Sequence, residues 1–411
     1  MLNFTLSPSG LEDQLLALVV ANERPDLEEA KNALVVSNAK MKKELKEIED
    51  KILYLLSSVQ GSPVDDERLI DTLAASKVTS GEIQVKVATA EKTEKAIDDT
   101  RIQYAPVAVR TRILFFCITE LGLIDPMYQY SLGWFMTLFT AAIGNSEKSD
   151  DLPTRLKNLN EYFTFSLFSN VCRSLFEKHK LLFSFLLAVR ILMNEGRIDP
   201  LEWRFLLAGG DAVENPLPNP CPDWLTQRAW SEIQSLSKSL PAFNGFAETF
   251  LTSNVAGFKA IFESSSPHRE ALPGQWKDKL DLFRKLLVLR CLRSDRVTSG
   301  IQDFVAANLG ERFVEPQTSE LAAIYKESYA WTPLIFVLSP GADPANSLIK
   351  FADEMRFSKK MSSISLGQGQ GPRAELLLRE GMERGKVYEK STLKFLISTF
   401  KAFGCCCRIA I

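Results

Sequence analysis

Residues 25–56, PDLEEAKNALVVSNAKMKKELKEIEDKILYLL, repeat apolar side chains at the spacing of a coiled coil. One apolar residue recurs at every seventh position: Leu27, Leu34, Met41, Ile48 and Leu55. The second position of the seam holds Leu45 and Ile52, and most of the remaining residues are polar or charged. A seven-residue period of this kind predicts a helix whose apolar seam packs along a second helix.

The second helix is expected after Gln60-Gly61-Ser62-Pro63, which is a turn signal. Its repeat runs through Leu69, Ser76, Ile83, Ala90 and Ile97, with Leu73 and Val87 at the second position. Polar residues interrupt this seam at Ser76, Ser80 and Glu94, which predicts a rod less stiff than a leucine zipper. We therefore expect an antiparallel coiled-coil hairpin over residues 25–103. The alternative is two amphipathic helices lying on a globular core, but a phase held over about four heptads in each arm favours the projecting hairpin.

The composition is that of a soluble globular protein of 411 residues, 45% hydrophobic and 24% charged. A formal net charge of −2 argues against a general nucleic-acid-binding surface or a surface for anionic membranes. The seven cysteines lack the CxxC spacing of a zinc site, which indicates reduced thiols, and the separated His179 and His268 are interpreted as structural. The longest apolar run, residues 181–189, is too short to span a bilayer. No metal site is expected.

Residues 333–348, PLIFVLSPGADPANSL, have the layout of a phosphate-binding loop without its chemistry. A buried-strand run at 334–338, a tight turn and a helical pattern is how a P-loop presents backbone N–H groups to phosphates. The loop is assigned to Ser339, Pro340, Gly341, Asp343 and Pro344. Ala345 occupies the position of the phosphate-binding Lys, and Asn346 that of the Ser or Thr that holds magnesium. The pattern predicts a nucleotide-binding scaffold without its catalytic groups.

A second strand–turn–helix pattern follows, with a strand at 362–366 and a helix at 373–384. Its turn contains Gly367, Gly369 and Gly371, which alone are a weak signal for a dinucleotide site. No acidic residue follows at the distance expected in a Rossmann fold. A stand-alone nucleotide-binding enzyme is therefore disfavoured, because no phosphate-binding Lys, general base or metal cluster stands where one is needed.

The rest of the chain is predicted to be mostly helical. Residues 2–6 are interpreted as a short strand, 7–10 as a turn and 11–21 as a helix. Residues 104–212 and 224–310 carry apolar residues at helical spacing, and the proline-rich segment 209–223 is interpreted as a loop or linker. The predicted fold class is mainly α, with a coiled-coil hairpin, helical subdomains and an incomplete α/β, P-loop-like unit near the C-terminus.

Several stretches together resemble the dynein heavy chain, in wording closest to axonemal heavy chains of the inner-arm type. The matching stretches are GLEDQLLALVVANERPDLEE (10–29), LKEIEDKIL (45–53), DPMYQYSLGWF (125–135), NVCRSLFEKHKLLFSFLL (170–187), PLIFVLSPGADP (333–344) and SLGQGQGP (365–372). The resemblance extends from residue 2 to about residue 385 and implies the end of the fifth AAA+ module and the start of the sixth. It implies six segments: 1–24, the end of module five; 25–103, the buttress hairpin of its small subdomain; 104–212, a helical block leading into module six; 213–330, a helical lid or linker region; 331–385, a partial degenerate P-loop core; and 386–411, a tail outside the family.

The resemblance implies part of a microtubule motor ring in the cytoskeleton of a cilium or flagellum. This segment would relay nucleotide-driven changes of the ring to the microtubule-binding stalk. The implied partners are the remainder of the heavy chain and dynein intermediate or light chains, with microtubules reached only through the parent motor; neither nucleic acid nor membrane is expected. ATP and magnesium belong to the parent motor, no cofactor is expected in this segment, and module six does not hydrolyse ATP.

The departures from the family pattern matter as well. The hydrolysing first module, the linker and the stalk are not in this sequence, so the chain is expected to be a truncated isoform or partial product without enzymatic activity of its own. A non-catalytic helical scaffold is the alternative function. Residues 331–411 are expected to be poorly ordered or aggregation-prone, because two parallel strands without neighbours leave sheet edges unpaired. An amphipathic helix at 393–403 is the candidate cover for those strands.

Overall fold

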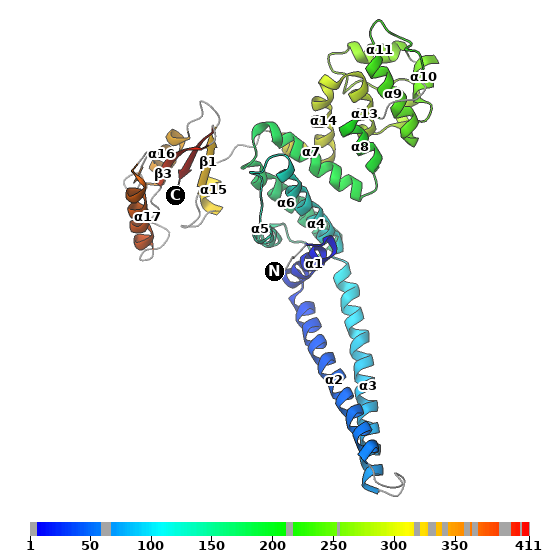
Figure 1. The fold of residues 1–411 in the computed structure, drawn as a ribbon, viewed down its shortest axis with the longest axis vertical. Coiled ribbons are helices and arrows are strands. Elements are labelled where there is room, and N and C mark those ends of the chain that lie inside the picture. Colours follow the sequence, from blue (N-terminus) through cyan, green and yellow to red (C-terminus); the bar gives the residue numbers. More distant parts are fainter. Residues whose placement is uncertain are drawn as a thin grey trace. The chain divides into compact units, whose positions relative to one another are not determined.

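The computed structural model describes residues 6–58, 67–210, 217–252, 255–315, 321–327, 334–338, 344–356, 362–363, 369–385, 396–402 and 405–410. The chain divides into two compact units, Met1–Glu315 and Pro316–Ile411. The described secondary structure of the first unit consists of helices, whereas the second unit combines helices with a small sheet (Figure 1). The mainly-α fold class is confirmed.

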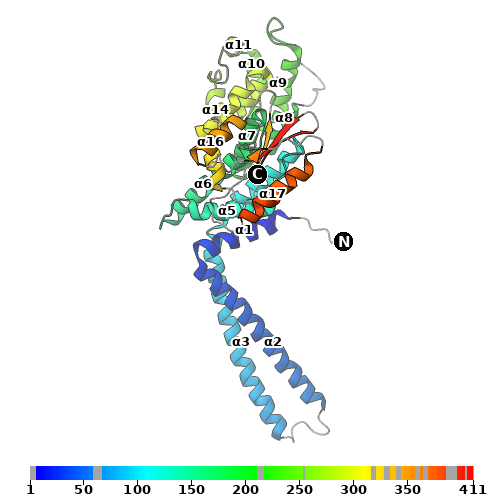
Figure 2. The same ribbon diagram turned by 90° about the vertical axis from the view of Figure 1, so that its left-hand side faces the viewer.

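The first unit begins with the hairpin and a bundle that we call the first bundle, formed by α1 and α4–α7. These elements are α1 (Pro8–Glu23), α2 (Pro25–Ser58), α3 (Glu67–Ile102), α4 (Ala105–Glu120), η1 (Leu121–Leu123), α5 (Leu132–Asn145), α6 (Leu152–Cys172) and α7 (Glu177–Asn194). Helices α2 and α3 run side by side as an antiparallel pair (Figure 1 and Figure 2). The predicted coiled-coil hairpin is therefore confirmed as a pair of long helices.

The remaining helices of this unit form the second bundle. They are α8 (Pro200–Ala208), α9 (Gln227–Ser239), η2 (Pro241–Phe243), α10 (Phe246–Thr252), α11 (Val255–Glu263), α12 (Trp276–Lys279), α13 (Leu282–Leu292), η3 (Ser294–Arg296), α14 (Val297–Leu309) and η4 (Glu311–Phe313). Helix α14 packs against α7, so one apolar core extends through both bundles.

Local sequence explains where several of these helices begin. Ser131, Asp151 and Thr226 each accept a hydrogen bond from the backbone N–H three residues later, which satisfies a donor left free at a helix start. Ser7 does the same for Gly10 at 3.1 Å, with Pro8 opening α1. The predicted turn at 7–10 is therefore wrong, because this Ser-Pro pair starts a helix. The strand predicted at 2–6 lies almost wholly outside the described residues.

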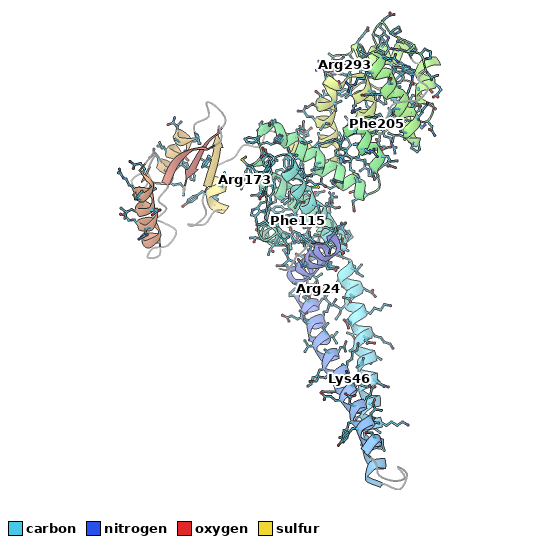
Figure 3. The ribbon with its side chains drawn as sticks, viewed as in Figure 1. Arg24, Lys46, Phe115, Arg173, Phe205 and Arg293 are labelled. Atoms are coloured by element: carbon cyan, nitrogen blue, oxygen red, sulfur yellow. The ribbon has the colours of Figure 1, made fainter. Side chains whose placement is uncertain are left out.

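Aromatic side chains fill the cores of both bundles. In the first bundle, the Phe139 and Phe163 rings meet edge to face with centroids 4.8 Å apart, and Figure 3 places Phe115 in the same bundle. In the second bundle, the Phe246 and Trp276 centroids are 4.9 Å apart. Trp276 is fully buried, so the aromatic residues along these helices serve packing. Within the described residues, the model contains no helix with the length and apolar character needed to cross a bilayer.

The second unit contains a four-stranded sheet in the order β1-β4-β3-β2. Its elements are α15 (Leu321–Glu327), β1 (Leu334–Leu338), α16 (Ala345–Glu354), β2 (Ser362–Ser363), α17 (Gly371–Gly385), β3 (Leu396–Ala402) and β4 (Cys405–Ala410). Strand β4 runs antiparallel to β1 and to β3, while β2 and β3 are parallel. The Tyr325 and Phe351 rings, with centroids 5.7 Å apart, join α15 to α16.

The sheet corrects two expectations about the C-terminal region. Leu396–Ala402 is strand β3, so the helix predicted at 393–403 is wrong. Strand β1 does not lack a neighbour either: it pairs with β4 from Leu334 opposite Ala410 to Leu338 opposite Cys406. Both corrections have one cause, because the antiparallel strands β3 and β4 lie between β1 and β2, the two strands predicted from the sequence.

Candidate functional site

The seam of the hairpin brings the predicted heptad residues of α2 and α3 together. Ile83, Ala90 and Ile97 of α3 are buried. The seam residues that are partly buried are Leu27, Leu34, Met41, Leu45, Ile48, Ile52 and Val87. The side chains of the remaining predicted members, Leu55, Leu69 and Leu73, lie outside those that the structure describes. A seam of this kind holds two long helices together by apolar burial along one stripe of each.

A polar layer interrupts the seam in the half of the hairpin nearer the bundle. Asn38 is buried, with 6% of its surface exposed, and its amide Nδ2 donates to Glu94 Oε2 at 3.2 Å. Asn38 stands seven residues before Leu45, so it occupies a core position of the heptad. A buried polar pair at a core position favours one register over its neighbours, because a shifted register would leave both groups unpaired. Sequence reasoning noticed Glu94 but missed Asn38, although its heptad position was available as a signal.

Charge pairs across the two arms reinforce the same register close to the bundle. Lys31 Nζ lies 2.6 Å from Asp98 Oδ1, Arg101 lies 3.3 Å from Glu28, and Lys42 lies 3.1 Å from Glu91. Burial is the largest single influence on Asp98 and raises its pKa, but the hydrogen bonds and charges of Lys31 and Arg101 together lower the pKa of Asp98 below its ordinary value.

Each arm of the hairpin joins the first bundle through a very short connection. Arg24 alone separates α1 from α2, and Pro25 begins the second helix. Figure 3 shows Arg24 at this joint and Lys46 further along the α2 arm. On the other arm, Gln103 and the buried Tyr104 separate α3 from α4. Connections of one and two residues leave little freedom between each arm and the bundle helix that continues it.

A buried arginine fixes the end of α1 at this joint. Arg155 of α6 is 2% exposed and donates two hydrogen bonds to the Glu23 carboxylate, from Nε at 2.9 Å and from Nη2 at 2.7 Å. It also donates to the carbonyl oxygens of Ile143, Ser146 and Glu147, which lie at and just beyond the C-terminal end of α5. One guanidinium thus holds α1, α5 and α6 together, with only Arg24 between Glu23 and the start of the hairpin.

The Glu23 carboxylate is held ionised by this arrangement. The hydrogen bond from Arg155 is the largest influence and lowers the pKa of Glu23, while burial acts in the opposite direction. Lys148 lies 3.1 Å from the same carboxylate but is 63% exposed. Because Arg155 and Glu23 are 132 residues apart in the chain, no local pattern pointed to this pair.

The predicted nucleotide-loop residues are described only in part. Residues 339–343, which include Ser339, Pro340, Gly341 and Asp343, lie outside the described residues, as does Gly367. Pro344 precedes α16, whose first two residues are Ala345 and Asn346. A strand, Leu334–Leu338, and a helix, Ala345–Glu354, therefore lie before and after this segment. The assignment of Ala345 to the position where a P-loop carries Lys stays a prediction.

The glycine-rich turn ends at α17. Gly369 has φ +83°, a conformation that favours glycine, and Gly371 is the first residue of the helix.

The histidines and the described cysteines are placed in the helical unit. Tyr128 Oη lies 2.8 Å from His179 Nδ1 and also accepts the Phe176 N–H, so His179 joins a structural network. Cys117, Cys172, Cys221 and Cys291 are buried and unpaired. Burial raises the pKa of the Cys172 thiol to about 12, which disfavours the reactive thiolate. The described residues contain no group of His, Cys, Asp and Glu able to hold a metal ion.

Comparison with known proteins places these features in a family. Residues 1–83 match the model of the ATP-binding dynein motor region, and residues 329–388 match the dynein heavy chain region D6 P-loop domain. Dynein axonemal heavy chain 1 of Homo sapiens is 62% identical over 386 residues, which cover 94% of this chain. The chain belongs to the dynein heavy chain family. Two further dynein heavy chains are similar over 94% of the chain: dynein axonemal heavy chain 3 of Mus musculus, 48% identical, and the dynein-1-beta heavy chain of the flagellar inner arm I1 complex of Chlamydomonas reinhardtii, 41% identical.

These dynein heavy chains are much longer than the chain described here. The aligned residues cover 9% of the human relative, 9% of the mouse relative and 8% of the algal one. The chain thus spans less than a tenth of the length of the relatives that it matches. One family model covers residues 1–83, which include α1, α2 and part of α3, and the other covers residues 329–388, which include β1 and α16. Both regions also carry the sequence patterns described above.

Proposed function

We propose that this chain is a structural, force-transmitting segment of an axonemal dynein motor ring. In this role the α2–α3 hairpin carries nucleotide-driven movements of the ring to the microtubule-binding stalk. The observation that supports this most directly is the rooted hairpin: two long helices with one polar register-setting layer, each joined to the bundle through one or two residues. A lever needs both properties, because a flexible root or a sliding seam would absorb the movement.

The proposal extends to the place and partners of the protein. The relatives named above are axonemal and flagellar heavy chains, so we place this chain in the axoneme of a cilium or flagellum. Its partners are then the remaining parts of a dynein heavy chain and associated intermediate or light chains. Microtubules are reached only through the stalk. In terms of the AAA+ ring, residues 25–103 are the buttress of module five and residues 331–385 belong to module six.

We further propose that the chain alone does not hydrolyse ATP. Ala345 and Asn346 supply neither the cation that contacts the phosphates nor the hydroxyl that holds magnesium. Phosphate release by the purified chain with magnesium-ATP is expected to stay at the level of buffer alone. Steady ATP turnover that survives repurification would contradict this proposal.

The lever role is tested by Ile83→Asp, introduced at the corresponding position of an intact axonemal heavy chain. Ile83 is 8% exposed in the seam, and a carboxylate there would be buried without a partner and would separate the two arms. We expect the ratio of microtubule affinities between nucleotide states to fall toward one, while basal ATP hydrolysis changes much less. Microtubule co-sedimentation in each nucleotide state measures the ratio. Normal switching of affinity would show that the hairpin is not the lever.

A matched control lies two residues further along the same helix. Val85 is 67% exposed, so Val85→Asp adds the same charge without entering the seam. We expect Val85→Asp to keep the affinity ratio within about twofold of the unmodified motor, since surface substitutions away from packing contacts have small effects. Equal loss in both variants would assign the effect to charge on the hairpin and not to the seam.

A further inference from the structure

A segment between α4 and α5 is tied to the start of α7 through Tyr128. Tyr128 is 2% exposed, and its hydroxyl oxygen lies 2.8 Å from His179 Nδ1. The same oxygen accepts the Phe176 backbone N–H at 3.1 Å. The Tyr128 and His179 rings meet edge to face, with centroids 5.7 Å apart. One phenol group thus joins this segment to the helix that begins at Glu177.

The contacts of the Tyr128 hydroxyl determine the direction of its hydrogen bond to His179. Burial raises the pKa of Tyr128, so the phenol keeps its proton, and that proton needs an acceptor. The Phe176 N–H is a donor, so among the described residues the acceptor is His179 Nδ1. An imidazole that accepts at Nδ1 is neutral and carries its own proton on Nε2.

Protonation of His179 would reverse this hydrogen bond. Nδ1 would then donate to the Tyr128 oxygen, and the phenol proton, in a side chain that is almost fully buried, would lose its acceptor. His179 is also the third residue of α7, where the positive end of the helix dipole disfavours a further positive charge. Both effects favour the neutral imidazole while Tyr128 stays in contact with it.

Charged groups near this pair act in both directions. The carboxylates of Asp125, in the same segment as the tyrosine, and Glu177, in the first turn of α7, favour a protonated imidazole. Arg173, in the turn before α7, and Lys178 and Lys180, on either side of the histidine, oppose it. Glu177 lies 2.7 Å from Lys180, and within the described residues neither carboxylate forms an ion pair with the histidine. No direct ion pair therefore offsets the loss of the hydrogen bond from the phenol.

We propose that Tyr128 and His179 form a pH-sensitive latch, closed while the histidine is neutral and opened when the histidine takes up a proton. The closed latch holds residues 124–129 against the start of α7. Tyr130 Oη lies 2.7 Å from Ser174 Oγ and joins the same two parts of the chain. Burial raises the pKa of Tyr130, so this second contact does not titrate near neutral pH. The latch does not depend on the role proposed for the hairpin.

The tautomer of His179 is the first test. The sequence contains two histidines, so His268→Gln leaves His179 as the single imidazole of the full chain. Nitrogen-15 NMR of the ring then shows which nitrogen carries the proton. We expect a bare Nδ1 and a protonated Nε2 at neutral pH. A proton on Nδ1 would overturn the proposal, because the imidazole would then already be the donor to Tyr128.

Hydrogen exchange at the Phe176 amide measures opening directly, because that N–H donates to the Tyr128 hydroxyl. A histidine in water has a pKa of about 6.5, so a latch that closes only on the neutral form should open about tenfold more readily at about pH 5.5 than at about pH 7.5. The Phe176 protection factor, which corrects for the pH dependence of chemical exchange, should fall by that factor of about ten. A fall of less than about twofold, or an equal fall for the amides of α9, would contradict the latch.

Variants assign the effect to the two side chains. His179→Asn keeps an acceptor oxygen near the position of Nδ1 but does not titrate, so Phe176 should be equally protected at both pH values. Tyr128→Phe keeps the ring and removes the hydroxyl, so protection should be low at both. His268→Gln is the matched control and should keep the fall of about tenfold. Circular dichroism confirms that each variant is folded. If either folded variant at the latch still shows the fall of the unmodified chain, another group senses the pH and the proposal is wrong.

Discussion

Arg155→Met should lower the free energy of unfolding of the helical unit by about 3–5 kcal/mol, the usual result of removing one partner from a buried ion pair. Methionine fills a similar volume but leaves the Glu23 carboxylate, 9% exposed, without its bidentate donor. It also leaves the Ile143 and Glu147 carbonyl oxygens without the guanidinium that they contact. Urea denaturation followed by tryptophan fluorescence measures the change, because five of the six tryptophans belong to this unit.

Lys148→Met is the control for this variant. Lys148 contacts the same Glu23 carboxylate, but its side chain is 63% exposed, so its contribution should be at most about 1 kcal/mol. Equal losses in Arg155→Met and Lys148→Met would show that the carboxylate needs only a nearby positive charge. The proposed role of Arg155 as the fixed point of the hairpin root would then fail.

The stabilisation from the Glu23–Arg155 ion pair should decrease as the pH falls. The folded state lowers the pKa of Glu23, chiefly through Arg155, so the stabilisation is present above the ordinary pKa of a glutamate. It is lost as the pH falls through the lowered folded value, when the carboxylate takes up a proton. The unmodified chain should therefore lose more stability than Arg155→Met between neutral and acidic pH, since in the variant only Lys148 still lowers the pKa of Glu23, against the opposing effect of burial.

The sequence predicts the hairpin because its evidence is local and periodic. Leu27, Leu34 and Met41 recur every seven residues, a spacing that places them on one face of a helix, where a second helix can bury them together. The same heptad pattern predicts a polar layer in the seam, because it places Asn38 at a core position. Which residue of α3 it meets depends on the register between the two arms, and the heptad spacing within each arm does not determine that register.

The root of the hairpin could not be predicted in this way. Glu23 and Arg155 look like ordinary surface residues of amphipathic helices when each is read alone. Their burial arises because α1, α5 and α6 meet at one point, which is a property of tertiary packing. A buried ion pair between residues 132 positions apart leaves no mark in any sequence window.

The C-terminal sheet shows the opposite difficulty. Leu396–Ala402, LISTFKA, mixes apolar and polar residues over seven positions, and a segment this short is compatible with either a helix or a strand. The available pairing partners decide between the two. Strand β4 pairs with both β1 and β3, so the backbone groups of β1 and β3 are hydrogen-bonded to it. A helix at 396–402 would satisfy its own backbone but would leave that sheet unformed. Predicting this would have required knowledge of the pairing itself.

The second large effect is expected from Trp230→Ala, which should destabilise the helical unit by about 3–5 kcal/mol. Trp230 of α9 is fully buried, and its ring packs against Phe250 with centroids 5.7 Å apart. Its indole Nε1 donates to the Leu217 carbonyl oxygen at 2.9 Å, which ties the described end of the proline-rich linker to the second bundle. The substitution removes both the ring and the tie, and urea denaturation followed by circular dichroism measures the loss.

Trp224→Ala provides the comparison, because Trp224 lies in the same aromatic cluster, 6.2 Å from Phe250, but is only partly buried. Its loss should be clearly smaller than that of Trp230. Gln234 also donates to the Leu217 carbonyl oxygen, at 2.9 Å, so that oxygen keeps one donor in Trp230→Ala. The cost should therefore come mainly from the vacated ring volume, and Trp230→Phe should recover most of it. If Trp230→Phe is as damaging as Trp230→Ala, the hydrogen bond and not the packing holds the linker to this bundle.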